Sequence, residues 1–308
     1  MSTTNPTAPP PDANPRPTLA LVVTADDFGI GLDTSRGIIR AHLHGPVTAT
    51  SLMSITGEHA RASVALLANA PDLEVGLHLV LTGCGQLPLV ARQSSGLVGR
   101  NGRFFSNGRL WRKAFLGKLD QTAIADEISA QAELFHHLLG RPPAYVDGHH
   151  HAHQLPIVRD ALLAVIAQGL LPPVTRITIE APRMIRKISS VRAKRIAADF
   201  LGRRAAPAFH QRGLFTNDYF FGMLTPRLLS QDFPWQTYLN HLPNSGVIEW
   251  VVHPGMPDDT LIGRDDYQAQ RVRELESLTL PQGIKAWEHL RPHLSRKSIL
   301  HNRELTLR

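Results

Sequence analysis

The sequence contains little cysteine, few aromatic residues and no long hydrophobic run. Cys84 is the one cysteine in 308 residues, which excludes a disulfide within the chain and favours a reducing compartment. Aromatic residues make up 6% of the chain. No stretch approaches the roughly eighteen apolar residues of a transmembrane helix, and the pattern of a signal peptide is missing. These absences predict a cytoplasmic protein.

The remaining composition is that of a globular protein. Hydrophobic residues make up 43% of the chain, which is enough for a large core. Residues 1–18 are rich in Pro, Thr and Asn, and they predict a flexible extension that contributes nothing to the fold. We therefore expect residues 19–308 to form a single catalytic domain.

The positive charge is partly concentrated in one segment. The chain has a formal net charge of +7, and Arg183 to Arg204 contains eight Lys or Arg with one acid, Asp199. This segment predicts a basic helix or a pair of helices, most simply with a solvated face. Contact with phosphate or with an anionic membrane is the alternative. No nucleic acid partner is expected, because aromatic residues do not interleave with the basic ones.

Apolar runs of strand length alternate with helical patterns along the chain. This order predicts βα units, largely parallel strands and a barrel-like α/β fold of distorted TIM type. The expected strands cover residues 19–24, 48–54, 73–81, 144–146, 175–179 and 247–252. The expected helices cover residues 33–42, 58–69, 120–139, 156–168, 264–279 and 284–290. The Gly-rich stretch 82–109 predicts a long loop that borders the substrate.

Residues suited to metal or proton chemistry follow several of these strands. Asp26 and Asp27 follow the first strand, and two adjacent carboxylates are costly unless a cation or a shared proton relieves them. One acid can then bind metal while its neighbour acts as a base. His78 lies within an apolar strand and is either a core histidine or a ligand. Because active sites of parallel α/β folds lie at the carboxyl ends of strands, we expect these side chains to meet.

Two further motifs contain histidine. His149, His150, His151 and His153 follow Asp147, and neutral imidazole is a common metal ligand. His149 and His153 would share one face if this segment were helical. His253 follows the last clear strand, where it can protonate a leaving group. A metal held by one Asp and two His leaves positions open for water and substrate, and a spare carboxylate can accept a proton, a set that suits amide hydrolysis.

These motifs resemble those of the YdjC/ChbG family of carbohydrate deacetylases, which includes hopanoid-associated members. The matching stretches are Thr24 to Gly29, Gly37 to Ile39, Val47 to Ser51, Val75 to Leu79, Gly140 to Pro143, the histidine cluster and His253-Pro254. The histidine cluster differs from the versions typical of hopanoid-pathway members. The resemblance implies a barrel related to polysaccharide deacetylases, one divalent metal ion, often a homodimer, and hydrolysis of N-acetyl groups on an amino sugar or glycolipid.

The resemblance also implies residue roles. Asp27 corresponds to the metal-binding acid, His78 and His149 to its imidazole ligands, and Asp26 to the base. His253 corresponds to the proton donor. His153 can replace or assist His149, and His151 is a further candidate for metal or substrate binding. The family favours Mg²⁺, whereas mixed carboxylate and imidazole ligands also suit Zn²⁺.

Two other functions fit parts of the sequence. A metal-dependent phosphoesterase or amidohydrolase can use similar Asp and His ligands, commonly with two metals. A basic binder of anionic lipid or nucleic acid would depend on the 183–204 segment and would bind in a salt-dependent manner. The deacetylase is the preferred hypothesis because it accounts for all of the motifs together.

Overall fold

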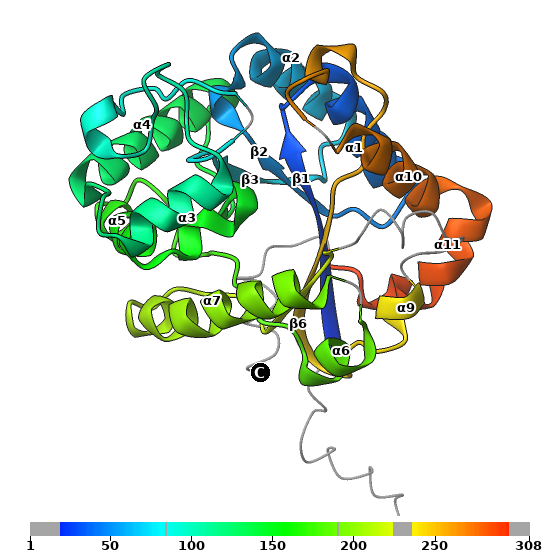
Figure 1. The fold of residues 1–308 in the computed structure, drawn as a ribbon. Coiled ribbons are helices and arrows are strands. Elements are labelled where there is room, and N and C mark those ends of the chain that lie inside the picture. The colour runs from blue at the N-terminus through cyan, green and yellow to red at the C-terminus, as the bar shows by residue number, and fades with distance from the viewer. Residues whose placement is uncertain (1–18, 84, 190, 224–235, 266, 296–308) are drawn as a thin grey trace, which may run out of the picture.

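The computed structural model describes residues 19–83, 85–189, 191–223, 236–265 and 267–295, and its centre is a six-stranded parallel sheet (Figure 1). The strand order is β4-β3-β2-β1-β6-β5. The strands are β1 (Leu19–Phe28), β2 (Ala49–Leu52), β3 (Glu74–Leu79), β4 (Val146–Gly148), β5 (Tyr219–Phe221) and β6 (Gly246–Val252). The predicted extension 1–18 and Cys84 lie outside the described residues.

Helices surround the sheet. They are α1 (Leu32–His44), α2 (Glu58–Leu66), α3 (Asn107–Phe115), α4 (Gln121–Leu139), α5 (Pro156–Ala167), α6 (Pro182–Lys187), α7 (Arg192–Gln211), α9 (Gln236–Leu239), α10 (Gln268–Thr279) and α11 (Pro281–Trp287). In the view of Figure 1, α1, α10 and α11 lie to the right of β1, α3, α4 and α5 gather to its left, and α2 lies above its end. None of the described helices has the length and hydropathy needed to span a membrane.

The sheet curls toward a closed barrel beyond its edge strands. Val146 of β4 forms a parallel bridge with Thr175, and Val174 forms one with Phe215, shortly before β5. Farther along, the Phe220 amide donates to the Ile179 carbonyl at 2.8 Å. These contacts continue the hydrogen bonding from β4 round to β5, as a distorted barrel requires.

The predicted strand 175–179 is wrong beyond these isolated bridges. The amide side chain of Asn217 binds both the N–H and the C=O of Ile177, each at 2.8 Å. Farther along, the Gln154 side chain accepts from the Thr178 amide at 3.1 Å. Side chains therefore satisfy backbone groups that a strand ladder would otherwise pair.

Other boundaries also differ from the prediction. The first strand continues past residue 24 to Phe28, so the acid pair lies within β1 rather than after it. The expected loop 82–109 ends in the unpredicted helix α3, and the late helix begins at Gln268 rather than at 264. The basic segment forms a pair of helices, α6 and α7, as expected.

A local irregularity in β1 positions the acid pair. The pairing of β1 with β2 shifts register between Ala25 and Phe28, and Asp27 has a left-handed φ of 68°. In a regular strand two consecutive side chains point to opposite faces. The bulge therefore allows Asp26 and Asp27 to serve one site.

The interior of the curled sheet has two layers, because strand side chains repeat with a period of two residues. A small apolar cluster fills one layer and consists of Val22, Ala49, Tyr145, Val174 and Val247. Two residues farther along the same segments stand buried polar residues, namely Thr24, Ser51, Asp147, Arg176 and Glu249. The catalytic candidates therefore rest on a polar layer inside the barrel.

A close contact between α1 and the segment after His253 supplies the first prediction. A Cβ added at Gly37 in α1 would lie 2.6 Å from the backbone of Gly255. Gly37→Ala should destabilise the fold by about 1–3 kcal/mol, because backbone atoms must move. Gly108 in α3 is the matched control, since a Cβ there meets nothing within 4 Å.

Urea unfolding of both variants measures the difference. Gly108→Ala should be neutral or stabilising by up to about 1 kcal/mol through helix propensity. Equal midpoints for the two variants would show that α1 does not pack on this segment as described.

Candidate metal centre and active site

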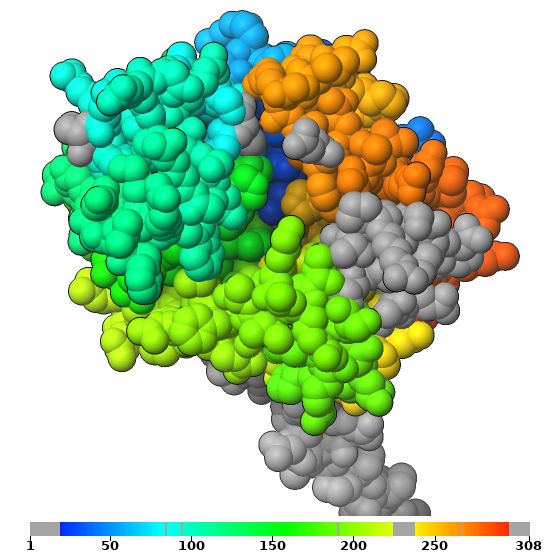
Figure 2. Space-filling view, viewed as in Figure 1, coloured from blue at the N-terminus to red at the C-terminus, as the bar shows by residue number. Residues whose placement is uncertain are grey.

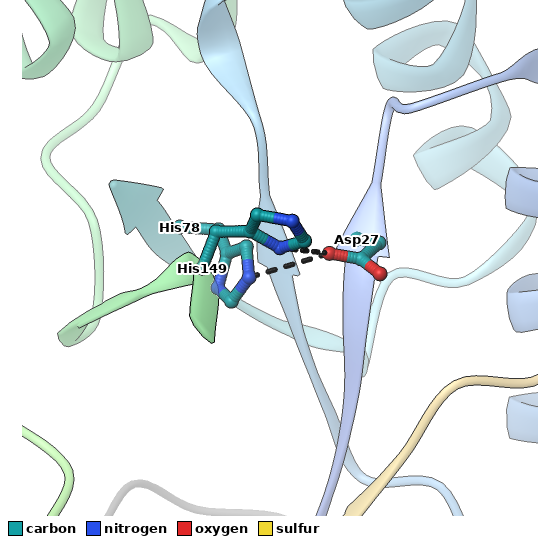
Figure 3. Close-up of side chains that lie close together, drawn as sticks. All are labelled: Asp27, His78 and His149. Atoms are coloured by element: carbon teal, nitrogen blue, oxygen red, sulfur yellow. Dashed lines mark hydrogen bonds and ion pairs between the residues drawn. The ribbon is translucent and has the colours of Figure 1, made fainter. Parts of the chain in front are cut away.

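Three side chains from separate segments converge on one point. Asp27 from β1, His78 from β3 and His149 from the turn after β4 all lie within coordinating reach of one another (Figure 3). The Asp27 Oδ1 atom is 3.3 Å from His78 Nε2 and 3.0 Å from His149 Nδ1. A carboxylate oxygen and two imidazole nitrogens form a donor set that divalent metal ions accept.

Asp147 fixes the orientation of His78. The Nδ1 atom of His78 lies 2.6 Å from Asp147 Oδ1, so the ring turns Nε2 toward Asp27. Ser51 donates to the other oxygen of Asp147 at 2.7 Å. This carboxylate–histidine pair is the arrangement that orients imidazole ligands in metal sites.

The surroundings shift the pKa values of both main ligands. Burial alone would lower the pKa of His78, but the carboxylates of Asp147 and Asp26 outweigh it and raise the pKa to about 9. Burial would raise the pKa of Asp27, but Arg271 and His149 hold it well below its usual value. In the absence of metal, a proton on His78 therefore takes the place that a cation would occupy.

A buried arginine underlies the centre. The Arg176 guanidinium donates to both oxygens of Asp26, at 2.7 and 2.8 Å. It also contacts Asp147 at 2.6 Å and Glu249 at 2.9 Å. Burial would raise the pKa of Asp26, but this guanidinium outweighs burial and keeps Asp26 ionised.

A second arginine holds Asp27. The Arg271 side chain in α10 donates through Nη2 to Asp27 Oδ2 at 2.7 Å and through Nε to Asp265 at 2.7 Å. Since Oδ2 is engaged by Arg271, Oδ1 is the oxygen that faces the two histidines.

The remaining histidines of the cluster take other positions. The 3₁₀ turn His149–Gln154 is interrupted at His150 and His151, which have left-handed φ values of 56° and 57°. The expected helical face shared by His149 and His153 therefore does not form. His153 is fully buried behind the centre, where its Nε2 lies 2.9 Å from the Arg176 carbonyl, and the structure brings His149 rather than His153 to Asp27.

His150 and His151 both line the pocket described below. His150 Nδ1 is 2.9 Å from the Thr82 hydroxyl, and burial lowers the pKa of His150 to about 3. The ring of His151 meets Phe220 edge-on at 5.2 Å, and burial also lowers its pKa. Both rings are therefore neutral near pH 7.

The fourth motif reaches the same pocket. His253 follows β6, its backbone N–H donates to Glu274, and its ring lies edge-on to Tyr267 at 5.4 Å. The buried Nδ1 atom of His253 has no hydrogen-bond partner among the described residues.

A cavity of about 820 Å³ opens above these groups, and its lining includes Asp26, Asp27, His78, His149 and His253. Figure 2 shows a central hollow with dark blue atoms of the β1 region at its bottom. The hollow is bounded by the turquoise segment that includes α3, the yellow-green segment that includes α7 and the orange segment before α10. This volume is within the range of small-molecule sites.

A second group of possible ligands overlaps the first. Asp26, His78 and Asp147 also lie within coordinating reach of one another. Both carboxylates of that group bind Arg176, and it shares His78 with the first group. Asp27, His78 and His149 therefore fit a single metal ion better.

Sequence reasoning assigned no role to Arg176, Arg271, Asp147 or Glu249. A charged residue inside an apolar strand pattern was the available signal for Arg176 and Glu249, since such a residue needs a buried partner. Arg271 gave no such signal, because an arginine in a predicted helix is ordinarily solvated.

Comparison with known proteins agrees with this architecture. The model of the YdjC-like protein family matches residues 20–288. The chain belongs to this family. The resemblance seen in the sequence motifs is thereby confirmed.

Two curated relatives are both named chitooligosaccharide deacetylase. The protein of Yersinia pestis (strain Pestoides F) is 33% identical over 275 residues, which covers 85% of this chain and 91% of that protein. The protein of Serratia marcescens is 41% identical over 152 residues, or 49% of this chain and 57% of that protein.

A solved structure from Enterococcus faecalis V583, described as that of a cellobiose-phosphate cleavage protein, superposes with a TM-score of 0.72. It shares 23% sequence identity and covers 94% of this chain and 99% of its own. This likeness confirms the predicted barrel-like α/β fold.

The raised pKa of His78 predicts that metal binding depends on pH. Because the metal must displace a proton, apparent affinity should rise by up to about tenfold per pH unit until pH reaches about 9. Calorimetric titration of the metal-free protein with a divalent metal ion, in buffers of different ionisation enthalpy, should show that metal binding releases a proton near pH 8.

The same shift has a consequence for stability. The pKa of His78 in the folded protein, about 9, lies above the ordinary histidine value of 6.5. Protonation of His78 therefore stabilises the metal-free fold, fully below pH 6.5, and this stabilisation is lost as pH rises through about 9. Asp147→Asn is the informative variant, since it removes the largest contribution that raises the pKa. Proton release unchanged in Asp147→Asn would contradict the assignment to His78.

The burial of Arg176 predicts that its substitution lowers the free energy of unfolding far more than substitution of an exposed arginine does. Arg176→Met should cost about 3–5 kcal/mol, because it leaves buried carboxylates without their cation. The matched control is Arg203→Met, whose side chain is 49% exposed and pairs with Asp199 at 2.7 Å. That control should cost at most about 1 kcal/mol. Urea unfolding with similar losses for both variants would refute the role of Arg176.

Proposed function

We propose that this chain is a metal-dependent carbohydrate deacetylase that hydrolyses the N-acetyl amide of an amino sugar. The observation that carries the proposal is the convergence of Asp27, His78 and His149 at the bottom of a pocket that Asp26 and His253 also line. Membership of the YdjC-like family and two relatives named chitooligosaccharide deacetylase support it. An N-acetylated chitooligosaccharide is accordingly the first substrate to test.

Asp27, His78 and His149 would hold the divalent ion. When bound, such an ion polarises an amide carbonyl and makes a nearby water more acidic. The protein's own contribution is orientation, because Asp147 fixes His78 and Arg271 fixes Asp27. Both side chains are therefore held in place before a metal enters, and the metal has to displace the protons that His78 and His149 share with Asp27.

Asp26 is proposed as the general base. Its carboxylate lines the pocket beside Asp27 and is held in one orientation by the two hydrogen bonds from Arg176. Arg176 keeps Asp26 ionised and ready to accept the proton of an attacking water. The same interaction makes Asp26 a weak base, so proton transfer becomes favourable only as the water adds to the carbonyl.

His253 is proposed as the proton donor to the departing amine. It stands in the pocket lining directly after β6, whereas Asp26 lies in β1, and its Nδ1 has no partner among the described residues. Glu274 holds its backbone N–H, and the edge-on contact with Tyr267 orients its ring. The register pairs Ala25 with Val252, so Asp26 and His253 follow neighbouring positions of β1 and β6 and can act on the same amide.

A phosphoesterase or amidohydrolase remains the second candidate. Phosphate chemistry commonly uses two metal ions, whereas the two ligand groups here share His78 and one is occupied by Arg176. One bound ion per chain would thus favour the deacetylase. The cytoplasmic location, the homodimer and the choice of Mg²⁺ over Zn²⁺ stay predictions.

Acetate release from a panel of N-acetylated sugars and glycolipids tests the activity. We expect release from chitooligosaccharides that a chelator abolishes and added metal restores. Asp26→Asn should retain metal but lose turnover by about 10²-fold or more, the scale of general-base catalysis. Asp27→Ala should lose metal and turnover together.

Asp33→Asn is the matched control, because Asp33 is a partly exposed acid of α1 that pairs with Arg36 and is not part of the pocket lining. It should retain both metal and turnover. Full activity in Asp26→Asn would remove the base assignment, and chelator-resistant acetate release would remove the metal from the reaction.

A further inference from the structure

The most exposed large hydrophobic side chains of the described residues belong to segments that line the pocket. Phe115 is 92% exposed, Ile262 70% and Phe200 57%. They belong to three segments that also line the pocket, through Trp111 in α3, Arg264 after Ile262, and residues of α7. Isolated exposed hydrophobic residues are ordinary, but three on separate segments around one opening form a pattern that calls for a partner.

The exposed face of α7 combines large hydrophobic side chains with basic ones. Ile196 and Phe200 are four residues apart and therefore share a face, and both are exposed, at 47% and 57%. Exposed basic residues flank them, including Arg192 and Arg204, and the Arg204 guanidinium lies 5.5 Å from the centre of the Phe200 ring. The charged segment noted in the sequence thus forms an amphipathic basic helix at the pocket mouth.

Helix α3, another segment of the pocket lining, also presents exposed hydrophobic and basic side chains. Trp111 lines the pocket, and Phe115, four residues later, projects into solvent beside exposed Arg112 and Leu116. The sequence from residue 75 to 119 contains no acid at all. Around the mouth, Asp199 of α7 is buried and paired with Arg203. The third segment is not basic: Asp259 is exposed there, Asp265 lines the pocket and pairs with Arg271, and Arg264 is its exposed cation among the described residues.

We propose that these three segments form a docking surface for an anionic lipid bilayer. Basic residues alone would suit any polyanion, but a polyanion in water gains nothing from the exposed tips of Phe115, Phe200 and Ile262. A bilayer offers anionic headgroups to the arginines and an apolar layer just beneath them to the large hydrophobic side chains. The docked protein would hold its pocket opening against the membrane surface.

Vesicle sedimentation of the full chain tests this surface. The protein should bind vesicles of phosphatidylcholine mixed with phosphatidylglycerol and should bind pure phosphatidylcholine far less. Phe115→Ser combined with Ile262→Ser should weaken binding by about tenfold or more. Arg112→Gln should weaken it by about fivefold, the effect of one cation near an anionic surface.

The controls are residues of the same type at other positions. The double substitution Leu43→Ser and Leu170→Ser removes side chains that are 53% and 38% exposed. They lie at the carboxyl end of α1 and just after the carboxyl end of α5. Arg40→Gln removes an exposed charge of α1. These variants should bind vesicles as the unaltered chain does. Acetate release from a soluble sugar should stay unchanged in all variants, so a failure here is distinct from a failure of the proposed function.

Three results would overturn the proposal. The first is the absence of binding to the anionic vesicles. The second is equal binding by the Phe115/Ile262 variant and its leucine control, which would mark general attraction between opposite charges. The third is a homodimer in solution that the Phe115/Ile262 substitutions dissociate, because this surface would then be covered by a second copy of the chain.

Discussion

The buried guanidinium of Arg176 is the interaction on which the architecture of the site depends. One planar group meets Asp26, Asp147 and Glu249, which come from three different strands. A lysine could not replace it, because only the guanidinium fork can donate to several carboxylates in fixed directions. Without this cation, the repulsion and desolvation of the three acids would oppose closing the sheet around them.

The arginine also connects the two chemical halves of the site. Through Asp26 it orients the proposed base, and through Asp147 it acts on His78, one of the proposed metal ligands. The curl of the sheet is what makes this sharing possible, because side chains of β1, β4 and β6 then face a common interior. Asp27, His150 and His151 have left-handed backbone conformations, each of which costs about 1–3 kcal/mol. The surrounding packing must offset this cost to hold the three residues in place.

Much of the frame follows from local sequence signals. Apolar runs located most strands, and the placement of polar residues at strand ends predicted that the four motifs meet. The resemblance to a known family then implied Asp27, His78 and His149 among them, with His153 as an alternative to His149. Where the sequence reading failed, long-range side-chain contacts decided the outcome. Asn217 and Gln154 replaced a strand ladder at Ile177 and Thr178, and a kink at His150 removed the helical pairing of two histidines.

The second class of failure concerns charge. Arg271 lies 244 positions from Asp27 in sequence, so no local pattern could reveal their contact. Arg176 and Glu249 were in principle visible as charges in apolar runs, but one chain cannot show which charge pairs with which. Among the described residues, buried acids outnumber buried basic residues, although the net charge of the chain is +7. The excess of basic residues therefore lies outside the buried interior.

This separation of charge has a physical consequence for the pocket. At and beneath its bottom, four carboxylates meet two guanidinium groups, an arrangement that attracts a cation. Asp26 and Asp27 line the pocket with Arg271, whereas Asp147 and Glu249 lie beneath it with Arg176. At its mouth, exposed arginines of α3 and α7 create a field of the opposite sign. Because exposed charges are screened beyond roughly 8 Å at physiological salt, the two fields act on different partners. The proposed metal site in the interior and the proposed membrane surface at the rim therefore do not oppose each other.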